Sequence, residues 1–159
     1  MPQRGIRVCL LILLMTYLLP LGLGAAAPKE KLAKGQLVYV PVYSHVYYGD
    51  QEKQILLTAI LSIRNTDPAR SVTLTQVDYY DSAGQLVKNY LSKPLSLKPL
   101  ASTRFVVAES DRRGGSGASF LVRWQMDAKV NPPLMEGVMI GTAGQQGISF
   151  TSRGVAIKE

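Results

Sequence analysis

Residues 55–64 read ILLTAILSIR, and this run has the pattern of a half-buried β-strand. Large apolar side chains recur at every second position, at Ile55, Leu57, Ala59, Leu61 and Ile63. An extended chain places such side chains on one face. Asn65–Pro68 follow with turn-forming residues, so the strand ends there. We expect this strand to supply the centre of a hydrophobic core.

The segment before it, LVYVPVYSHVYY over residues 37–48, alternates in the same way. Valines at 38, 40, 42 and 46 share one face, and the opposite face carries Tyr39, Pro41, Tyr43, His45 and Tyr47. Pro41 has no N–H to donate to a neighbouring strand, so we expect an edge strand or a bulged one. The pattern predicts one continuous strand with an aromatic second face.

Similar strands follow down the chain, separated by turn residues. Apolar residues change parity between Leu74 and Val77, which predicts a bulge near Thr75–Gln76. Asp81–Gly84 has the composition of a hairpin turn. We predict an all-β fold over residues 37–159: a single immunoglobulin-like, Greek-key β-sandwich of about seven or eight strands.

The N-terminus has the three regions of a secretory signal peptide. A basic start is followed by an apolar run too short for a membrane span, and then by small residues ending in Ala25–Ala27. We assign residues 1–26 to the signal peptide and 27–36 to a linker. The protein is therefore expected to be exported, to the periplasm or beyond the cell. The alternative is an uncleaved N-terminus, which would be the only membrane contact.

Composition excludes several kinds of site. The chain of 159 residues has one cysteine, Cys9, which lies in the signal peptide, and one histidine, His45. An internal disulfide, a cysteine zinc site and a multi-histidine metal site are thereby excluded. We expect no cofactor and no metal. The net charge of +7 is scattered, without a basic stripe that carries interleaved aromatics, so no nucleic-acid partner is expected.

Two surfaces are candidates for ligand binding. Tyr39, Tyr43, His45 and Tyr47 offer rings with polar tips that can stack on a sugar or a peptide, although such rings also serve to cover a core. Arg112 and Arg113 precede a glycine-rich stretch that reads GGSG. Its N–H groups and guanidiniums suit an anion, although a mobile loop between two strands has the same composition.

No catalytic residue is assigned. Ser44 and His45 are neighbours in an extended chain and point to opposite sides, so they do not form a nucleophile and base pair. Carboxylates at Asp78, Asp81 and Asp111 leave a hydrolase as the alternative function.

Several segments, in order and over about residues 37–157, resemble the bacterial domain of unknown function family 3124. They are Val38–His45, Ser62–Thr66, Val77–Val87, Glu109–Ala118, Val138–Gly141 and Gln146–Gly154. The resemblance implies an exported domain of one sandwich, and it supplies no activity and no catalytic residues. We expect a non-enzymatic binding or structural module of the cell envelope, with an envelope protein or glycan as partner. The alternatives are a carboxylate-dependent hydrolase and a membrane-anchored structural domain.

Overall fold

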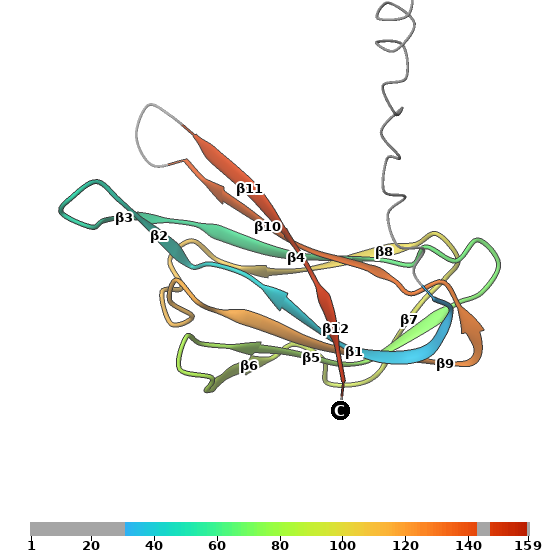
Figure 1. The fold of residues 1–159 in the computed structure, drawn as a ribbon. Coiled ribbons are helices and arrows are strands. Elements are labelled where there is room, and N and C mark those ends of the chain that lie inside the picture. The colour runs from blue at the N-terminus through green and yellow to red at the C-terminus, as the bar shows by residue number, and fades with distance from the viewer. Residues whose placement is uncertain (1–30, 143–146, 159) are drawn as a thin grey trace, which may run out of the picture.

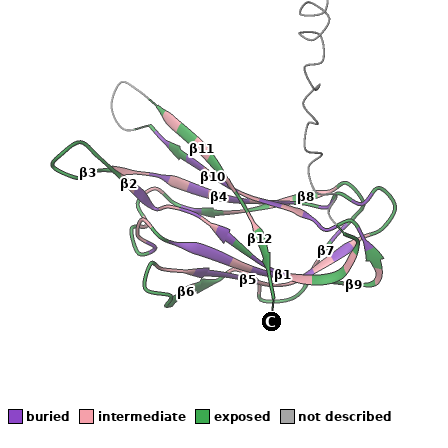
Figure 2. Ribbon diagram, viewed as in Figure 1, coloured by how far each residue is buried: buried purple, intermediate pink, exposed green. Residues whose placement is uncertain are grey.

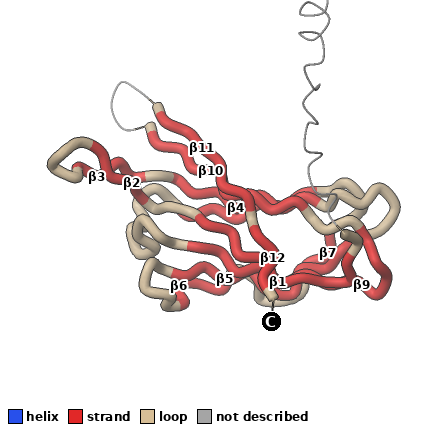
Figure 3. The backbone as a smooth tube through the Cα atoms, in the orientation of Figure 1, coloured by secondary structure: helices blue, strands red, loops and turns tan. Residues whose placement is uncertain are grey.

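The computed structural model describes residues 31–142 and 147–158, so the predicted signal peptide and the first part of the linker lie outside the described residues. Twelve strands and no helix are found within these ranges (Figures 1 and 3). Accordingly, no helix in the described part of the chain is able to cross a membrane.

The strands form two stacked sheets and one hairpin. A six-stranded sheet has the order β12-β1-β9-β5-β6, with β7 also on β5, and consists of β1 (Ala33–Pro41), β5 (Val72–Tyr80), β6 (Leu86–Asn89), β7 (Leu95–Leu97), β9 (Ser119–Val130) and β12 (Val155–Ile157). A four-stranded sheet has the order β11-β10-β4-β8 and consists of β4 (Thr58–Arg64), β8 (Ser102–Val107), β10 (Leu134–Gly141) and β11 (Ile148–Arg153). The hairpin joins β2 (His45–Tyr48) to β3 (Lys53–Leu56).

The core lies between the two sheets, and it is formed by the buried residues of their strands, which are purple in Figure 2. From the four-stranded sheet it receives Ala59, Leu61 and Ile63, together with Leu57 just before β4, all fully buried. From the six-stranded sheet it receives Val40, Phe120, Val122 and Trp124 among others. Burial of a large apolar side chain contributes about 1.5–3 kcal/mol, so this double layer supplies most of the stability without a disulfide.

The predicted all-β sandwich is confirmed, and its non-sequential strand order is that of Greek-key connections. The strand number is larger than the seven or eight expected. Residues 37–48 and 55–64 each divide into two strands, because the chain changes its hydrogen-bonding partners within both runs. The first strand begins at Ala33, four residues before the predicted start, because Ala33 and Gly35 already pair with β9.

Two local predictions are also confirmed. The register between β5 and β9 shifts between Leu74 and Gln76, which is the predicted bulge. Asp81–Gly84 forms the hairpin turn, in which Gly84 N–H donates to the Asp81 carbonyl (3.0 Å). Gly84 has a φ of 76°, a conformation that glycine adopts without steric cost.

Candidate functional site

The predicted tyrosine and histidine face does not form one surface, so the single continuous strand over residues 37–48 is wrong. The chain leaves the six-stranded sheet after Pro41, and its N–H groups then bond to a distant loop: Val42 to the Ala118 carbonyl (2.9 Å) and Ser44 to the Gly115 carbonyl (3.0 Å). Tyr39 remains on the outer face of the six-stranded sheet. The residues from Tyr43 onward belong to the crossing segment and the hairpin.

Tyr43 is packed against the core and contacts β11. Its ring lies 5.6 Å from the ring of Phe150 in an edge-to-face arrangement, and the side chain is partly buried. Such aromatic pairs contribute about 0.5–1.5 kcal/mol beyond the area that they bury. Tyr43 therefore serves to attach the crossing segment to the four-stranded sheet.

The β2–β3 hairpin carries the exposed aromatic residues of this region, and it projects from the body of the sandwich (Figure 1). Tyr47 and Tyr48 have 50% and 52% of their surface exposed. Since they are adjacent in β2, they occupy opposite faces of the hairpin. Tyr48 was not among the predicted site residues, because its parity matched the buried valines and nothing in the pattern showed that the strand leaves the core.

The ring of Tyr47 is held in place by its neighbours. His45 Nε2 lies 3.2 Å from the Tyr47 hydroxyl, and the two rings meet edge to face with centroids 5.1 Å apart. Gln54 Nε2 donates to the same hydroxyl from β3 (3.4 Å). His45 itself is 8% exposed, and its Nδ1 has no hydrogen-bond partner among the described residues. His45 thus positions Tyr47 and does not offer its own ring as a surface.

The glycine-rich loop is anchored, in contrast to the mobile loop that its composition indicates. Ser82 N–H and the Ser82 hydroxyl both donate to the Gly114 carbonyl (2.9 and 3.0 Å). Gly117 N–H donates back to the Ser82 hydroxyl (2.9 Å). At Gly114 a Cβ atom would overlap the Tyr79 hydroxyl and lie 2.7 Å from Ser44 Oγ, so glycine is required here for close approach.

The two arginines of this loop differ in their surroundings. Arg113 forms a two-pronged ion pair with Asp111 (2.6 Å from Nη2 to Oδ2 and 2.9 Å from Nε to Oδ1). The Arg113 guanidinium lowers the pKa of Asp111, and the Asp111 carboxylate raises the pKa of Arg113. Arg112 is exposed. Because the guanidinium of Arg113 is already paired with a carboxylate, the guanidinium of Arg112 is the one that would bind an anion.

Below this loop lies a group of aromatic rings, of which Tyr79 and Phe120 are buried and Tyr90 and Phe105 are partly buried. Tyr79 is 5.1 Å from Phe120, and Tyr90 is 5.6 Å from both Phe105 and Phe120. Burial raises the pKa of both tyrosine hydroxyls above the ordinary value of 10.0. The Tyr79 hydroxyl is hydrogen-bonded to Ser44 Oγ (3.1 Å), and both side chains are enclosed. This serine and tyrosine pair is therefore a structural contact that a substrate does not reach.

The carboxylates of the alternative hydrolase are each bonded to the fold. Asp78 accepts from Gln76 Nε2 and Asn89 Nδ2, both at 2.7 Å. Asp81 accepts the N–H groups of its own turn at Ala83 and Gln85 (2.9 and 2.8 Å). Among the described residues no three His, Cys, Asp or Glu side chains gather where they would hold a metal ion.

A further carboxylate, Asp67, belongs to a buried polar network that sequence reasoning had read only as a turn. It accepts N–H groups from Ala69 and Arg70 (3.0 and 2.9 Å) and from Asn131 (3.2 Å). Hydrogen bonds from this backbone lower the pKa of Asp67, the Ala69 N–H having the largest effect. The network ties the turn after β4 to the turn after β9.

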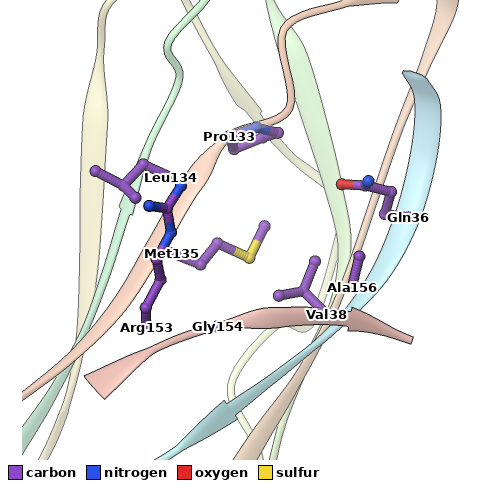
Figure 4. A pocket seen from close by; sticks show the side chains of 8 residues that line it. All are labelled: Gln36, Val38, Pro133, Leu134, Met135, Arg153, Gly154 and Ala156. Carbon is purple, nitrogen blue, oxygen red and sulfur yellow. The ribbon is translucent and has the colours of Figure 1, made fainter. Parts of the chain in front are cut away.

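The pocket shown in Figure 4 opens where the edges of the two sheets meet. Val38 and Ala156 line it from the six-stranded sheet, and Met135 and Arg153 line it from the four-stranded sheet. Its volume is about 20 Å³, which accommodates one water molecule. This pocket does not enclose a substrate.

Comparison with known proteins gives a family and a distant structural likeness. The family model described as "Protein of unknown function (DUF3124)" matches residues 35–157. No curated protein sequence matches the chain. A solved structure titled "Crystal Structure of Thermotoga maritima 1070" superposes with a TM-score of 0.46 and 10% sequence identity, over 76% of this chain and 92% of that chain. A likeness at this level carries no argument about function.

Proposed function

The chain belongs to the DUF3124 family of proteins of unknown function, and we propose that it is an exported, non-enzymatic module that binds a protein or a glycan of the bacterial cell envelope. One observation carries the proposal: the projecting β2–β3 hairpin presents Tyr47 and Tyr48, each about half exposed, on its two faces. Amphipathic rings on a protruding element are the residues that contribute most to recognition surfaces.

The hairpin face with Tyr47 is preorganised for binding. Contacts from His45 and Gln54 to the Tyr47 hydroxyl hold the ring in one orientation before a ligand arrives. A ring that is already ordered loses little conformational entropy on binding. Half of the Tyr47 surface remains exposed, so the residue is available to contact a sugar or a peptide.

The glycine-rich loop supports the hairpin from one side. Ser44, the residue before β2, bonds to the Gly115 carbonyl, so the loop lies beside the base of the hairpin. Arg112 is exposed on this loop and is the accessory contact that we propose, with Arg113 oriented toward Asp111. An arginine here suits a carboxylate or phosphate group of the partner.

The engaged carboxylates support a non-enzymatic role. A glycosidase needs two carboxyl groups that face one substrate across a cleft. Both carboxylate oxygens of Asp78 instead accept from side-chain amides of its own sheet, and Oδ1 of Asp81 accepts two N–H groups of its own turn. Asp111 is neutralised by Arg113.

Photocrosslinking in intact cells tests the hairpin as a binding surface. A photoreactive phenylalanine derivative replaces Tyr48 in the full chain, and a matched control carries it at Leu86, which is 55% exposed on β6. The proposal expects an adduct from position 48 that is absent from position 86. Equal labelling from both positions overturns the proposal. The absence of labelling from both positions also overturns it when the glycan measurement below is negative as well.

Co-sedimentation with purified peptidoglycan sacculi tests a glycan partner. The double variant Tyr47→Ala/Tyr48→Ala should bind at least about tenfold more weakly than the natural chain, because half-exposed aromatic anchors carry a large share of binding energy. Leu86→Ala is the control and should bind as the natural chain does.

Export is tested separately by intact mass. A soluble protein lacking residues 1–26 supports export, and an uncut chain in the membrane fraction supports the anchored alternative.

A further inference from the structure

The turn of the β2–β3 hairpin forms an open pocket. Its volume is about 350 Å³, and it is lined by Tyr48, Gly49, Asp50, Gln51 and Lys53. All five residues are exposed, and the hairpin carries them away from the body of the sandwich (Figure 1). Pockets that bind small molecules range from about 300 to 1,000 Å³. This pocket is therefore large enough for a small ligand, in contrast to the pocket of about 20 Å³ between the two sheets.

The pocket follows from the backbone of the hairpin. Tyr48 and Lys53 are directly opposite each other in the pairing of β2 with β3, so their side chains lie on the same face. Between them the chain reverses over four residues, and the Glu52 N–H donates to the Gly49 carbonyl (3.1 Å). Gly49 and Glu52 have φ values of 66° and 49°, so both lie in the left-handed region. The Glu52 side chain belongs to the same turn and does not line the pocket.

The groups that line the pocket are free to contact a ligand. The side chains of Asp50, Gln51 and Lys53 form no hydrogen bond or ion pair with any residue that the structure describes. The Tyr48 ring has no aromatic, cationic or hydrogen-bonding neighbour within the same residues. Tyr47 differs, because its hydroxyl is already held from two sides. The pocket thus offers an uncovered ring, a carboxylate, an amide and an ammonium group.

We propose that this pocket is a subsite for one pyranose ring of a glycan. The proposal rests on the proposed function, and it assigns the ligand class of the hairpin on its Tyr48 face. The apolar C–H face of the sugar stacks on the Tyr48 ring. Asp50 accepts hydrogen bonds from the sugar hydroxyls, Lys53 donates to them, and the Gln51 amide does both.

This mixture of groups favours a sugar over a charged peptide. A carboxylate only accepts and an ammonium only donates, whereas a hydroxyl does both, so one polyhydroxylated ring satisfies every polar group of the pocket. A zwitterionic peptide would match the charges of Asp50 and Lys53. Both charges are exposed, however, and ion pairs between exposed groups contribute little in water. The Tyr48 ring, 52% exposed, is the part that gains most from a ligand, and the flat face of a sugar covers it.

Titrations followed by NMR test the ligand class. The protein is purified after expression of the full chain, and the backbone amide signals of residues 49–53 report on the pocket. Glycan strands freed of their peptides by an amidase should shift these signals, with a dissociation constant on the order of 1 mM, since an open pocket contacts one ring only. The stem peptides released by the same amidase should not shift them. Polyglutamate, an anion without sugar rings, should not shift them either.

Substitutions in the hairpin test the pocket. Tyr48→Ala should weaken binding of the glycan strands at least about tenfold, because it removes the ring on which the sugar stacks. Tyr48→Phe keeps the ring and should bind as the natural chain does. Asp50→Ala should weaken binding at least about threefold, because it removes an acceptor of the sugar hydroxyls. Glu52→Ala is its matched control, since it removes a carboxylate of the same turn that does not line the pocket, and it should leave binding unchanged.

Each contrary result overturns a defined part of the proposal. Shifts from the stem peptides or from polyglutamate, in place of the glycan strands, refute the sugar. Glycan binding that is insensitive to both Tyr48→Ala and Asp50→Ala refutes the pocket, and the exposed Asp50 keeps this test valid should Tyr48→Ala fail to fold. The absence of shifts from every probe refutes the subsite. If the photocrosslink at position 48 persists in that case, the proposed function stands and only the sugar subsite is rejected.

Discussion

The hydrogen bond between Ser44 and Tyr79 attaches the crossing segment to the core, and we predict that its two ends are energetically coupled. Ser44 Oγ and the Tyr79 hydroxyl are 3.1 Å apart, and both side chains are shielded from water. Ser44→Ala or Tyr79→Phe deletes one hydroxyl and leaves the other buried without this partner. Each change should lower the free energy of unfolding by about 1.5–3 kcal/mol, the cost of a lost bond and an unsatisfied polar group.

The double variant distinguishes this reasoning from simple packing loss. With both hydroxyls removed no orphaned group remains, so the double change should cost about 1–2 kcal/mol less than the sum of the single changes. Urea unfolding measures all three variants through the fluorescence of Trp124, the single tryptophan, which is buried. Tyr48→Phe is the control and should change stability little, because that hydroxyl is on an exposed ring. Costs that add to within about 0.5 kcal/mol would refute the coupling.

Three further outcomes are expected. Gly114→Ala should cost about 2–4 kcal/mol in the same urea assay, because its Cβ overlaps the Tyr79 hydroxyl, and a neutral result would contradict the anchored loop. Tyr43→Ala should lower the free energy of unfolding by about 2–4 kcal/mol, since the Tyr43 ring packs against the core, whereas Tyr47→Ala should lower it by under about 1.5 kcal/mol, since the Tyr47 ring is half exposed. Thermal unfolding that ranks the two variants in the opposite order would disprove this prediction. Burial raises the pKa of Tyr79 and Tyr90, so the folded state retains these two protons more tightly than the unfolded chain does. The stabilisation that the two protonated hydroxyls give the folded state is therefore complete below about pH 10. It should be lost as pH rises through the folded pKa values, and Tyr90→Phe should make the alkaline fall in unfolding midpoint shallower.

Local pattern predicted a large part of the fold. Alternation at Leu57–Ile63 identified a strand whose inward residues are fully buried. The parity change before Val77 identified the bulge, and Asp81–Gly84 identified the turn. These features depend on side chains a few residues apart, because strand period and turn conformation are properties of the local backbone.

The candidate site was predicted less well. Tyr39, Tyr43, His45 and Tyr47 were expected on one surface, and the structure places them in an outer sheet face, a packed segment, a buried position and an exposed hairpin. The break after Pro41 arises from hydrogen bonds to Gly115 and Ala118, more than 70 residues away. No spacing within residues 37–48 records those bonds.

By itself the sequence determined the class of fold, the inward faces of most strands and the absence of disulfide and multi-histidine sites. These features follow from the types of residue present and from their order along the chain, both of which are fixed before the chain folds. Only the tertiary structure decided that the glycine loop is anchored by Ser82, and that Tyr48 is exposed while His45 is buried. It also decided that Tyr48, Asp50 and Lys53 line one pocket. The physical reason is that exposure and pairing depend on which distant strands become neighbours, and long-range hydrogen bonds set that order.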